Sequence, residues 1–285
     1  MDPSCLQYRL TQDEREIFER DGYLIIEGAL DLDTNNALVE VVDRLTGEDK
    51  LSARGDVGIA QRTNTLNFMG MDPKFVDMVD YPTTLPKVWG VLGWNISLYH
   101  SHMAVSFPTD STYNPDGPTF RWHQDSGRLN REMETDPAPR LSVKVAYFLT
   151  DVSEAGRGNF WVLPGSHLKK HVDMPASGMG QPEGATPVMV APGTAVIFDR
   201  RIWHTATPNC SSITRKVLFY GYGYRWIRTR DEMTIPEDLY EAADPIRKQI
   251  FGHAPNGEFG RSSPTDEDVP LRVWLRDHDP TAAVD

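Results

Sequence analysis

Residues 194–226 decide the fold, and they read TAVIFDRRIWHTATPNCSSITRKVLFYGYGYRW. Two segments in this stretch, 194–199 and 214–226, are rich in β-branched and aromatic residues and therefore predict strands. A Pro-Asn-Cys-Ser sequence at 208–211 lies between them and predicts a turn. The chain thus runs from strand to strand through a turn, without a helical pattern between them.

Segments of the same kind occur throughout the middle of the chain, separated by Gly, Pro, Asp and Ser turns. A parallel sheet needs a crossover helix between successive strands, and no helical pattern falls between these segments. The pattern therefore predicts a mainly β protein, an antiparallel sandwich or barrel of the jelly-roll type. The other predicted strands are residues 96–107, 119–125, 140–150, 159–163 and 187–190.

Helices are predicted on both sides of this β zone. Thr11 and Glu14 have the spacing of a capping box, and Gly22 stands where that helix should end. Pro245 interrupts a helical pattern near the C-terminus and should kink or split it. The remaining predicted elements are a strand at 23–27, helices around 38–45, 72–79 and 85–92, and the interrupted helix at 237–251.

We expect a single domain over residues 1–285. Its parts are a mostly helical segment over 1–94, a β core over 95–228, and a helix with a tail over 229–285.

The composition excludes several classes of protein. The 285 residues include 29 Lys and Arg against 41 Asp and Glu, a formal charge of −12. Nucleic acid and anionic lipid both require a concentrated basic surface, so we expect neither as a partner. The apolar runs fall far short of the roughly 20 residues that cross a bilayer. Two cysteines and no visible secretory signal favour a cytoplasmic protein.

His123, Asp125 and His204 together predict a metal site. Side chains two positions apart on a strand share a face, so His123 and Asp125 can reach one cavity. If His204 enters from a facing strand, the set is the two-histidine, one-carboxylate triad of non-haem Fe(II) oxygenases. Each residue alone has a plainer interpretation, as a surface pair or a packed core histidine. The joint pattern favours the metal.

Arg215 follows His204 by 11 residues, which allows one turn and a return to the same depth in the next strand. We therefore expect Arg215 beside the metal cavity, although alone it would be interpreted as a solvated strand end. Its guanidinium suits the remote carboxylate of 2-oxoglutarate, because it is permanently charged and binds carboxylates bidentately. Phe219 shares this strand face and predicts an apolar wall.

Further motifs accompany these residues along most of the chain. They are residues 18–24 (FERDGYL), Asn67 with 72–75 (DPKF), 122–125 (WHQD), 158–167 (GNFWVLPGSH), 193–198 (GTAVIF) leading to His204, and Asn209 with Arg215. Together they resemble the phytanoyl-CoA dioxygenase family of Fe(II)- and 2-oxoglutarate-dependent oxygenases.

The resemblance implies a double-stranded β-helix in which His123, Asp125 and His204 bind iron and Arg215 anchors 2-oxoglutarate. It also implies a reaction that consumes O₂, releases succinate and CO₂, and oxidises a C–H bond of a substrate, usually to an alcohol. Because Asp125 is present, halogenation, which the related halogenases achieve by losing this carboxylate, is disfavoured.

The chain departs from the family pattern at two positions. Members often carry a hydroxyl residue two positions after the distal histidine, where this chain has Ala206, so we expect Thr205 or Thr207 to take over part of that contact. Many also carry a long polar residue on the strand before the H-x-D motif, where this chain has His100, His102 and Ser106. We therefore expect His102 to contact the co-substrate or substrate.

Six further residues are candidates for the cavity. Phe160 and Trp161 alternate along a strand, so one of them faces the cavity, and we include Trp161 among the co-substrate contacts. Arg128 and Arg131 could recognise an anionic group or could be solvated loop charges. The full set of candidate substrate contacts is Arg128, Arg131, Arg62, Asn67 and Phe219.

The expected function is an Fe(II)- and 2-oxoglutarate-dependent oxygenase acting on a small molecule. A charge of −12 gives no general attraction for a polyanionic acyl-CoA, so a polar metabolite is preferred. Two alternatives stay open: an iron-dependent dioxygenase or isomerase that does not use 2-oxoglutarate, and a cupin-like binding protein without redox chemistry. The oligomeric state is left open.

Overall fold

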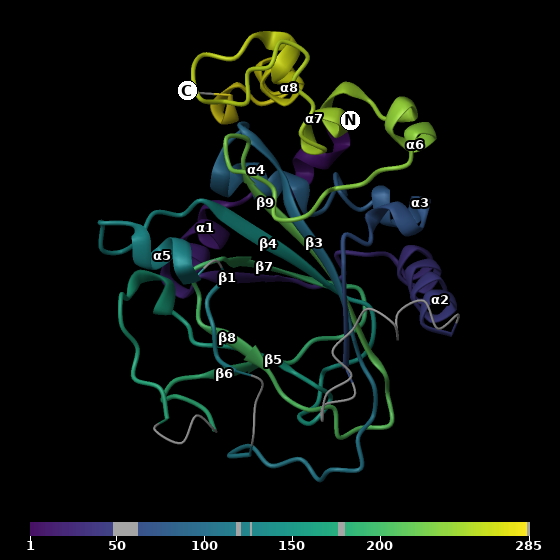
Figure 1. Cartoon of the computed structure of the whole chain (residues 1–285), viewed down its shortest axis with the longest axis vertical. Coiled ribbons are helices and arrows are strands. Elements are labelled where there is room, and N and C mark those ends of the chain that lie inside the picture. Colours follow the sequence, from purple (N-terminus) through teal and green to yellow (C-terminus); the bar gives the residue numbers. More distant parts are fainter. Residues whose placement is uncertain (48–61, 118–120, 126, 176–179, 284–285) are drawn as a thin grey trace.

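The computed structural model describes residues 1–47, 62–117, 121–125, 127–175 and 180–283. Two antiparallel sheets form its centre, a large one and a smaller one that lies across from it (Figure 1). The large sheet has the order β1 (Tyr23–Ile26), β7 (Thr194–Asp199), β4 (Ser142–Phe148), β9 (Arg215–Tyr224), β3 (Ile96–Ser106) and β2 (Arg62–Leu66). The small sheet has the order β6 (Thr186–Val188), β5 (Phe160–Val162) and β8 (His204–Ala206).

The two sheets pack face to face around an inner core. Phe148, Phe198 and Phe219 of the large sheet contact Phe160 and Val188 of the small sheet in one buried cluster. This arrangement confirms the predicted mainly antiparallel β fold with a jelly-roll core and flanking helices.

A second core lies between the outer face of the large sheet and a layer of helices. Tyrosines of the sheet reach into that layer: the Tyr220 and Tyr222 hydroxyls donate to the carbonyls of Phe75 and Val79. Because both faces are covered, β4 is buried along its whole length. The helices are α1 (Gln12–Asp21), α2 (Leu32–Gly47), α3 (Pro73–Val76), α4 (Leu85–Leu92), α5 (Gly127–Glu132), α6 (Glu237–Ala242), α7 (Pro245–Ile250) and α8 (Pro270–His278).

The sequence signals for helix ends are confirmed. Thr11 and Glu14 form a capping box at the start of α1, and Gly22 ends that helix in the left-handed conformation with φ +84°. Pro245 divides the C-terminal helical segment into α6 and α7. These helices gather with α8 at one end of the large sheet (Figure 1).

An irregularity in β3 decides which of its side chains face inward. The pairing register with β9 shifts between Leu98 and His100. Leu98 therefore belongs to the outer core, whereas Ala104 belongs to the inner core, although both are an even number of residues from His100. Gly221 lies opposite on β9, and a Cβ there would stand 2.8 Å from the Tyr99 ring.

One strand was missed, and one strand prediction was wrong. Residues 62–66, placed in the mostly helical segment, form the edge strand β2 against β3. The alternation of apolar and polar residues that marks a strand is absent from β2, because both of its faces are polar. Thr63 and Thr65 are buried on the outer face of the large sheet. Conversely, the described part of residues 119–125 forms only an isolated bridge, His123 to His204.

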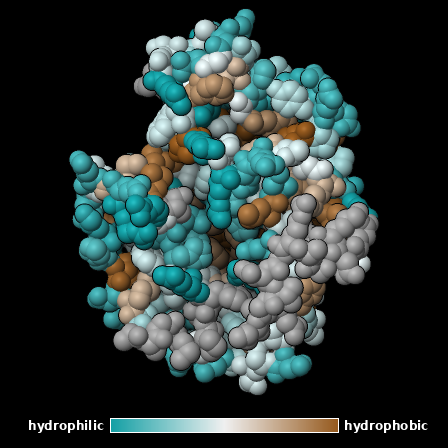
Figure 2. Space-filling view, viewed as in Figure 1, coloured by the Kyte–Doolittle hydropathy of each residue, from teal (hydrophilic) through white to brown (hydrophobic). Residues whose placement is uncertain are grey.

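The surface agrees with the acidic, polar composition. On the face shown in Figure 2, hydrophilic residues predominate, and the apolar residues lie singly or in small groups among them. Within the described ranges, the helices are all too short or too polar to cross a membrane.

Candidate metal centre

His123, Asp125 and His204 come together at one point, each offering one ligand atom, with these atoms all within 4.8 Å of one another. The backbones of His123 and His204 exchange two hydrogen bonds of 3.0 and 2.9 Å, which hold the two imidazoles side by side. His204 begins β8, whereas His123 and Asp125 lie on an irregular segment and not on the strand that we predicted. The three side chains thus converge as expected, but an isolated β-bridge between His123 and His204 brings them together and not a regular strand.

The protons of both histidines are placed by backbone carbonyls. Nδ1 of His123 lies 2.9 Å from the carbonyl oxygen of Arg121, and Nδ1 of His204 lies 2.9 Å from that of Ile202. A carbonyl oxygen only accepts, so each Nδ1 carries a hydrogen, and Nε2 is the ring nitrogen left to face a metal. Burial and the neighbouring His123 lower the pKa of His204 to about 3, which keeps it neutral. Both rings could therefore bind a metal through Nε2.

Lys144 is a member of the site that the sequence analysis missed. Its Nζ lies 2.8 Å from Oδ2 of Asp125, and both side chains are at most 10 % exposed. Burial alone would raise the pKa of Asp125, but the charge of Lys144 is the largest effect opposing burial, and this pKa is held well below its usual range. The available signal was a single lysine inside the otherwise apolar segment of β4.

A cavity of about 550 Å³ adjoins the three converging side chains. Phe160, Phe198 and Phe219 form part of the apolar wall of this cavity. Of the three, Phe219 was predicted to form such a wall. Its polar lining includes residues from β2, β3, β4, β8 and β9. The polar lining residues are Arg62, Asn64, His100, His102, Arg121, His123, Gln124, Asp125, Lys144, His204, Thr205, Arg215 and Arg230.

Arg215 is a buried cation in this lining, 3 % exposed. Its guanidinium lies over the Phe148 ring at 5.6 Å, and its buried Nε has no hydrogen-bond partner. Burial, with a smaller contribution from the charge of Arg62, lowers the pKa of Arg215 to about 9, so the group is still charged near neutral pH. Over the ranges that the structure describes, no carboxylate pairs with it. A carboxylate of a ligand would supply the missing counter-charge.

Of the other residues predicted to contact the co-substrate, two face the cavity and one faces away from it. His102 and Thr205 line the cavity. Trp161 instead packs against Trp122 and Leu163 in a separate cluster, so Phe160 is the aromatic residue of β5 that faces the cavity.

The predicted substrate contacts are only partly brought together. Arg62 lines the cavity beside Phe219. The Asn67 side chain is used elsewhere, donating to the Thr234 hydroxyl and accepting from the Thr234 amide. The other two, Arg128 and Arg131, are exposed on α5, and Arg128 pairs with Glu132 on the same helix. Within the described ranges the cavity has other cations in addition to Arg62, and Arg121 and Arg230 are among them.

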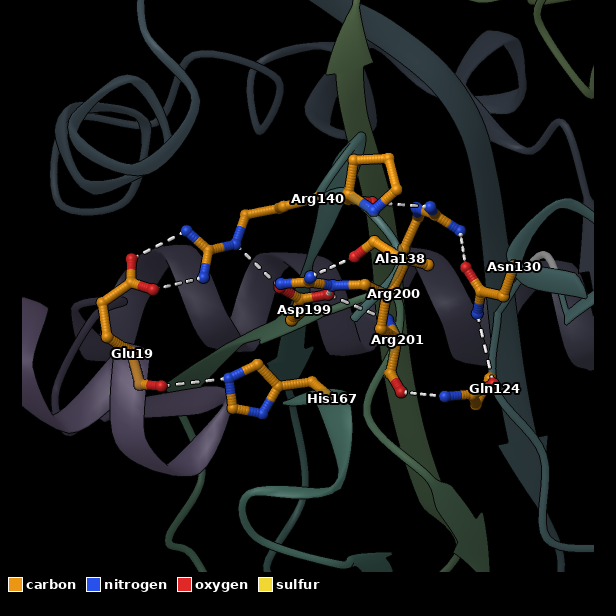
Figure 3. A network of polar contacts seen from close by, with 10 residues as sticks. Glu19, Gln124, Asn130, Ala138, Arg140, His167, Asp199, Arg200 and Arg201 are labelled. Atoms are coloured by element: carbon orange, nitrogen blue, oxygen red, sulfur yellow. Dashed lines mark hydrogen bonds and ion pairs between the residues drawn. The ribbon is translucent and has the colours of Figure 1, made fainter. Parts of the chain in front are cut away.

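A polar network supports the segment between the two ligand candidates of the H-x-D motif (Figure 3). Gln124 donates to the carbonyl of Arg201 at 2.5 Å and accepts from Asn130 at 3.2 Å. The Arg201 guanidinium in turn binds both oxygens of Asp199, at 2.8 and 2.6 Å. These contacts hold in place a stretch of chain that has no regular strand pairing.

The network continues to the first helix (Figure 3). Arg140 binds Asp199 at 2.7 Å and bridges it to both oxygens of Glu19 on α1, each at 2.7 Å. His167, from the Pro-Gly-Ser-His motif, contacts the Glu19 carbonyl at 3.1 Å. Two of the sequence motifs quoted above are therefore joined through side chains.

Comparison with known sequences gives matches over most of the chain. The sequence model of the phytanoyl-CoA dioxygenase (PhyH) family matches residues 18–217. An uncharacterised protein of Mycobacterium tuberculosis is 28 % identical over 242 residues, covering 80 % of this chain and 81 % of that protein. The ectoine dioxygenase of Bordetella parapertussis is 25 % identical over 242 residues, covering 75 % of each.

Solved structures with the same fold include two metal-bound proteins. HygX from Streptomyces hygroscopicus, with nickel, 2-oxoglutarate and hygromycin B, has a TM-score of 0.60 at 18 % identity, covering 81 % of this chain and 94 % of that chain. The epimerase SnoN, with Fe³⁺, α-ketoglutarate and nogalamycin RO, has a TM-score of 0.56 at 18 % identity, covering 79 % and 85 %. The family match includes the three converging side chains and Arg215, and this chain belongs to the phytanoyl-CoA dioxygenase family.

Proposed function

We propose that this protein is an Fe(II)- and 2-oxoglutarate-dependent oxygenase that oxidises a C–H bond of a small molecule. In this proposal His123, Asp125 and His204 hold the iron and Arg215 holds the remote carboxylate of 2-oxoglutarate. The observation that carries it is one cavity with two converging imidazoles, one carboxylate paired with Lys144 and one buried guanidinium lacking a described carboxylate partner. Bound iron would supply O₂ activation coupled to decarboxylation of 2-oxoglutarate.

The protein residues have separate tasks in this scheme. The carbonyls of Arg121 and Ile202 turn Nε2 of each histidine toward the metal position. Lys144 keeps Asp125 ionised, so that no proton has to leave when a cation binds. Arg215 sets the direction of the co-substrate, and the phenylalanines around it exclude water from the reacting groups.

A small polar metabolite is the proposed substrate, in preference to a whole acyl-CoA. The cavity of about 550 Å³ must hold 2-oxoglutarate as well as substrate, and it falls within the range of small-molecule sites. The fold neighbours HygX and SnoN were crystallised with hygromycin B and nogalamycin RO, which supports a small-molecule substrate. Thr205 and Arg62 line the same cavity, which supports them as proposed ligand contacts.

The test is turnover of 2-oxoglutarate by the purified protein with Fe(II) and O₂, measured as succinate. We expect succinate to form slowly even without a substrate, and an Arg215→Ala variant to lose it by about a hundredfold or more, because a charge-assisted bidentate contact is removed. If the wild-type protein binds iron but forms no succinate, the proposal fails.

The matched control is Lys216→Ala. Lys216 is the next residue of β9 and pairs with Asp43 on α2, away from the cavity. Its removal should leave succinate formation near the wild-type rate. An iron enzyme that does not use 2-oxoglutarate would instead tolerate Arg215→Ala.

A further inference from the structure

A chain of three side chains leads from the C-terminal segment into the cavity. Nδ1 of His100 lies 2.9 and 3.1 Å from the two carboxylate oxygens of Asp231. Nε2 of His100 lies 3.0 Å from Nδ1 of His102. Asp231 is itself fixed by the backbone N–H of Ser101 at 2.6 Å. The side chains of His100 and Asp231 are 1 % and 2 % exposed, so water does not compete for these bonds.

The direction of each hydrogen bond follows from Asp231. A carboxylate only accepts, so Nδ1 of His100 carries the hydrogen. Nε2 of a neutral His100 must then accept, so Nδ1 of His102 donates to it. A neutral His102 is left with a bare lone pair on Nε2.

Both histidines are neutral in this environment. Burial lowers the pKa of His100, and Asp231 opposes this only in part. Burial lowers the pKa of His102 more strongly, with Lys144 acting in the same direction. A positive charge on His102 would lie among cations, since Lys144 and Arg230 line the same cavity.

His102 is the end of the chain that meets the cavity. It is partly exposed there, and its ring stacks on Phe219 with centroids 4.2 Å apart and planes at 8°. The stacking and the bond to His100 fix the ring at two points. Nε2 forms no hydrogen bond to any residue in the described part of the chain.

We propose that His102 is a substrate-specificity residue, held by Asp231 and His100 as a hydrogen-bond acceptor, and that it selects a substrate bearing a hydroxyl or N–H group. This proposal rests on the proposed function. It assigns His102, which the sequence suggested as a contact of the co-substrate or the substrate, to the substrate. The carboxylate and keto oxygens of 2-oxoglutarate are all acceptors, so a bare Nε2 would repel them.

Asp231 and His100 are positioning residues in this scheme. Without Asp231, His100 could carry its hydrogen on either nitrogen, and His102 would lose its fixed polarity. His100 and His102 lie on β3 within residues 18–217, the range of the family match, whereas Asp231 lies outside it and comes from the C-terminal segment of this chain.

The first experiment reads the protons directly. The full-length protein is labelled with ¹⁵N in histidine and loaded with Zn(II), a diamagnetic substitute for iron, and 2-oxoglutarate. We expect the imidazole nitrogen shifts to show His102 protonated on Nδ1 and bare on Nε2. In Asp231→Leu we expect a mixture of tautomers. A proton on Nε2 of His102 in the wild-type protein would overturn the proposal.

Thr234→Ala is the matched control for Asp231→Leu. Thr234 ties the same segment to Asn67 and makes no contact with the histidine pair. This variant loosens the segment but should leave the tautomer of His102 as in the wild-type protein. If both variants lost the single tautomer of His102 to the same extent, anchoring of the segment would matter and not the carboxylate of Asp231. That result would contradict the proposal.

The second experiment separates substrate from co-substrate. In His102→Phe, which preserves the stacked ring, we expect the 2-oxoglutarate affinity to stay within about threefold of wild type, whereas loss of a hydrogen bond to a charged ligand costs about tenfold or more. A loss of 2-oxoglutarate affinity by about tenfold or more would show that His102 contacts the co-substrate and would refute the proposal. If the wild-type protein itself binds no 2-oxoglutarate, the proposed function fails instead.

The third experiment tests whether Nε2 of His102 acts as a hydrogen-bond acceptor. It uses ethanediol, which has hydroxyl donors, and 1,2-dimethoxyethane, which has none. We expect ethanediol to shift the Nε2 resonance of His102 in the Zn(II) and 2-oxoglutarate form, and dimethoxyethane to leave it in place. Equal responses to the two probes would show that Nε2 does not select donors.

Discussion

Two buried cations of the cavity, Lys144 and Arg215, are stabilised in different ways. Lys144 has a protein counter-charge, Asp125, whereas Arg215 has none among the described residues. A buried charge without a partner lowers the stability of a fold by several kcal/mol, unless a ligand supplies the opposite charge. Lys144 therefore serves a carboxylate of the protein, and Arg215 is suited to a carboxylate of a ligand.

Replacing Arg215 should make this difference measurable. We expect Arg215→Met to raise the free energy of unfolding by about 1–2 kcal/mol in the absence of 2-oxoglutarate, because an apolar side chain replaces an unpaired buried charge. Urea denaturation measures it. Arg140→Met is the control, since Arg140 is paired with Glu19 and Asp199 and its loss should destabilise the protein. Similar destabilisation by both substitutions would contradict this account of Arg215.

Lys144 should affect the metal although it is not a proposed ligand. We expect Lys144→Met to weaken Fe(II) binding by about tenfold to a hundredfold, the usual cost of losing a group that orients a metal ligand. In the variant, burial of Asp125 is no longer opposed by its ion pair, so its pKa rises and a proton competes with the metal. Anaerobic Fe(II) titration at pH 7 gives the affinity, with Lys216→Met as control. Unchanged affinity would show that Asp125 needs no counter-charge.

Among the elements, the long apolar strands and the capped helices could be predicted from sequence, but the irregular segments could not. The β4 and β9 segments carry strong β-branched and aromatic patterns, and α1 carries its caps at both ends. The strand β2 has polar residues on both faces, so periodicity did not reveal it. The His123 segment is held by the hydrogen bond from Gln124 to Arg201, which are 77 residues apart in sequence.

The site shows the same division. The three proposed ligands and Arg215 were predicted because their spacing is meaningful along the chain itself. Lys144, Arg230 and the link from His102 through His100 to Asp231 were missed, because these residues meet only through the pairing of β3, β4 and β9 and the return of the C-terminal segment. Arg128 and Arg131 were misplaced because α5 carries them outward.

The bulge of β3 should depend on Gly221. We expect Gly221→Ala to lower the free energy of unfolding by about 1–3 kcal/mol, because the added Cβ would lie 2.8 Å from the Tyr99 ring. Gly47→Ala at the end of α2 is the control, since a Cβ there meets nothing within 4 Å and should be neutral or slightly stabilising. Urea denaturation compares the two variants, and equal stabilities would argue against a tight contact at the bulge.

For the whole molecule, the network of Figure 3 joins the first helix, the large sheet and the metal segment. Its centre is Asp199, which is fully buried between Arg140 and Arg201. Burial raises the pKa of Asp199, but its ion pairs with Arg201 and Arg140 outweigh burial and lower it overall. The hydrogen bond from Arg140 likewise lowers the pKa of Glu19. The fold is thus stabilised by carboxylates that must stay ionised.

This network predicts a direction of pH dependence. Both pKa values are lower in the folded state, so their contribution is complete above the ordinary carboxylate pKa near 4 and is lost as the pH falls through the folded values. We expect Asp199→Asn to cost about 3–5 kcal/mol at pH 7, because two arginines lose a buried partner. Urea unfolding between pH 7 and pH 3 should show a smaller acid loss in Asp199→Asn than in wild type. Parallel pH curves would contradict this assignment.

The central claim is that one cavity holds a metal on His123, Asp125 and His204 and a 2-oxoglutarate carboxylate on Arg215. Anaerobic titration of 2-oxoglutarate into the Fe(II)-loaded protein, followed by the absorption of the chelated co-substrate, tests it most directly. The account predicts one 2-oxoglutarate per chain in the wild-type protein, an affinity at least about a hundredfold weaker in Arg215→Ala, and no chelate absorption in Asp125→Ala. Wild-type affinity in Arg215→Ala, or an undiminished absorption in Asp125→Ala, would contradict it.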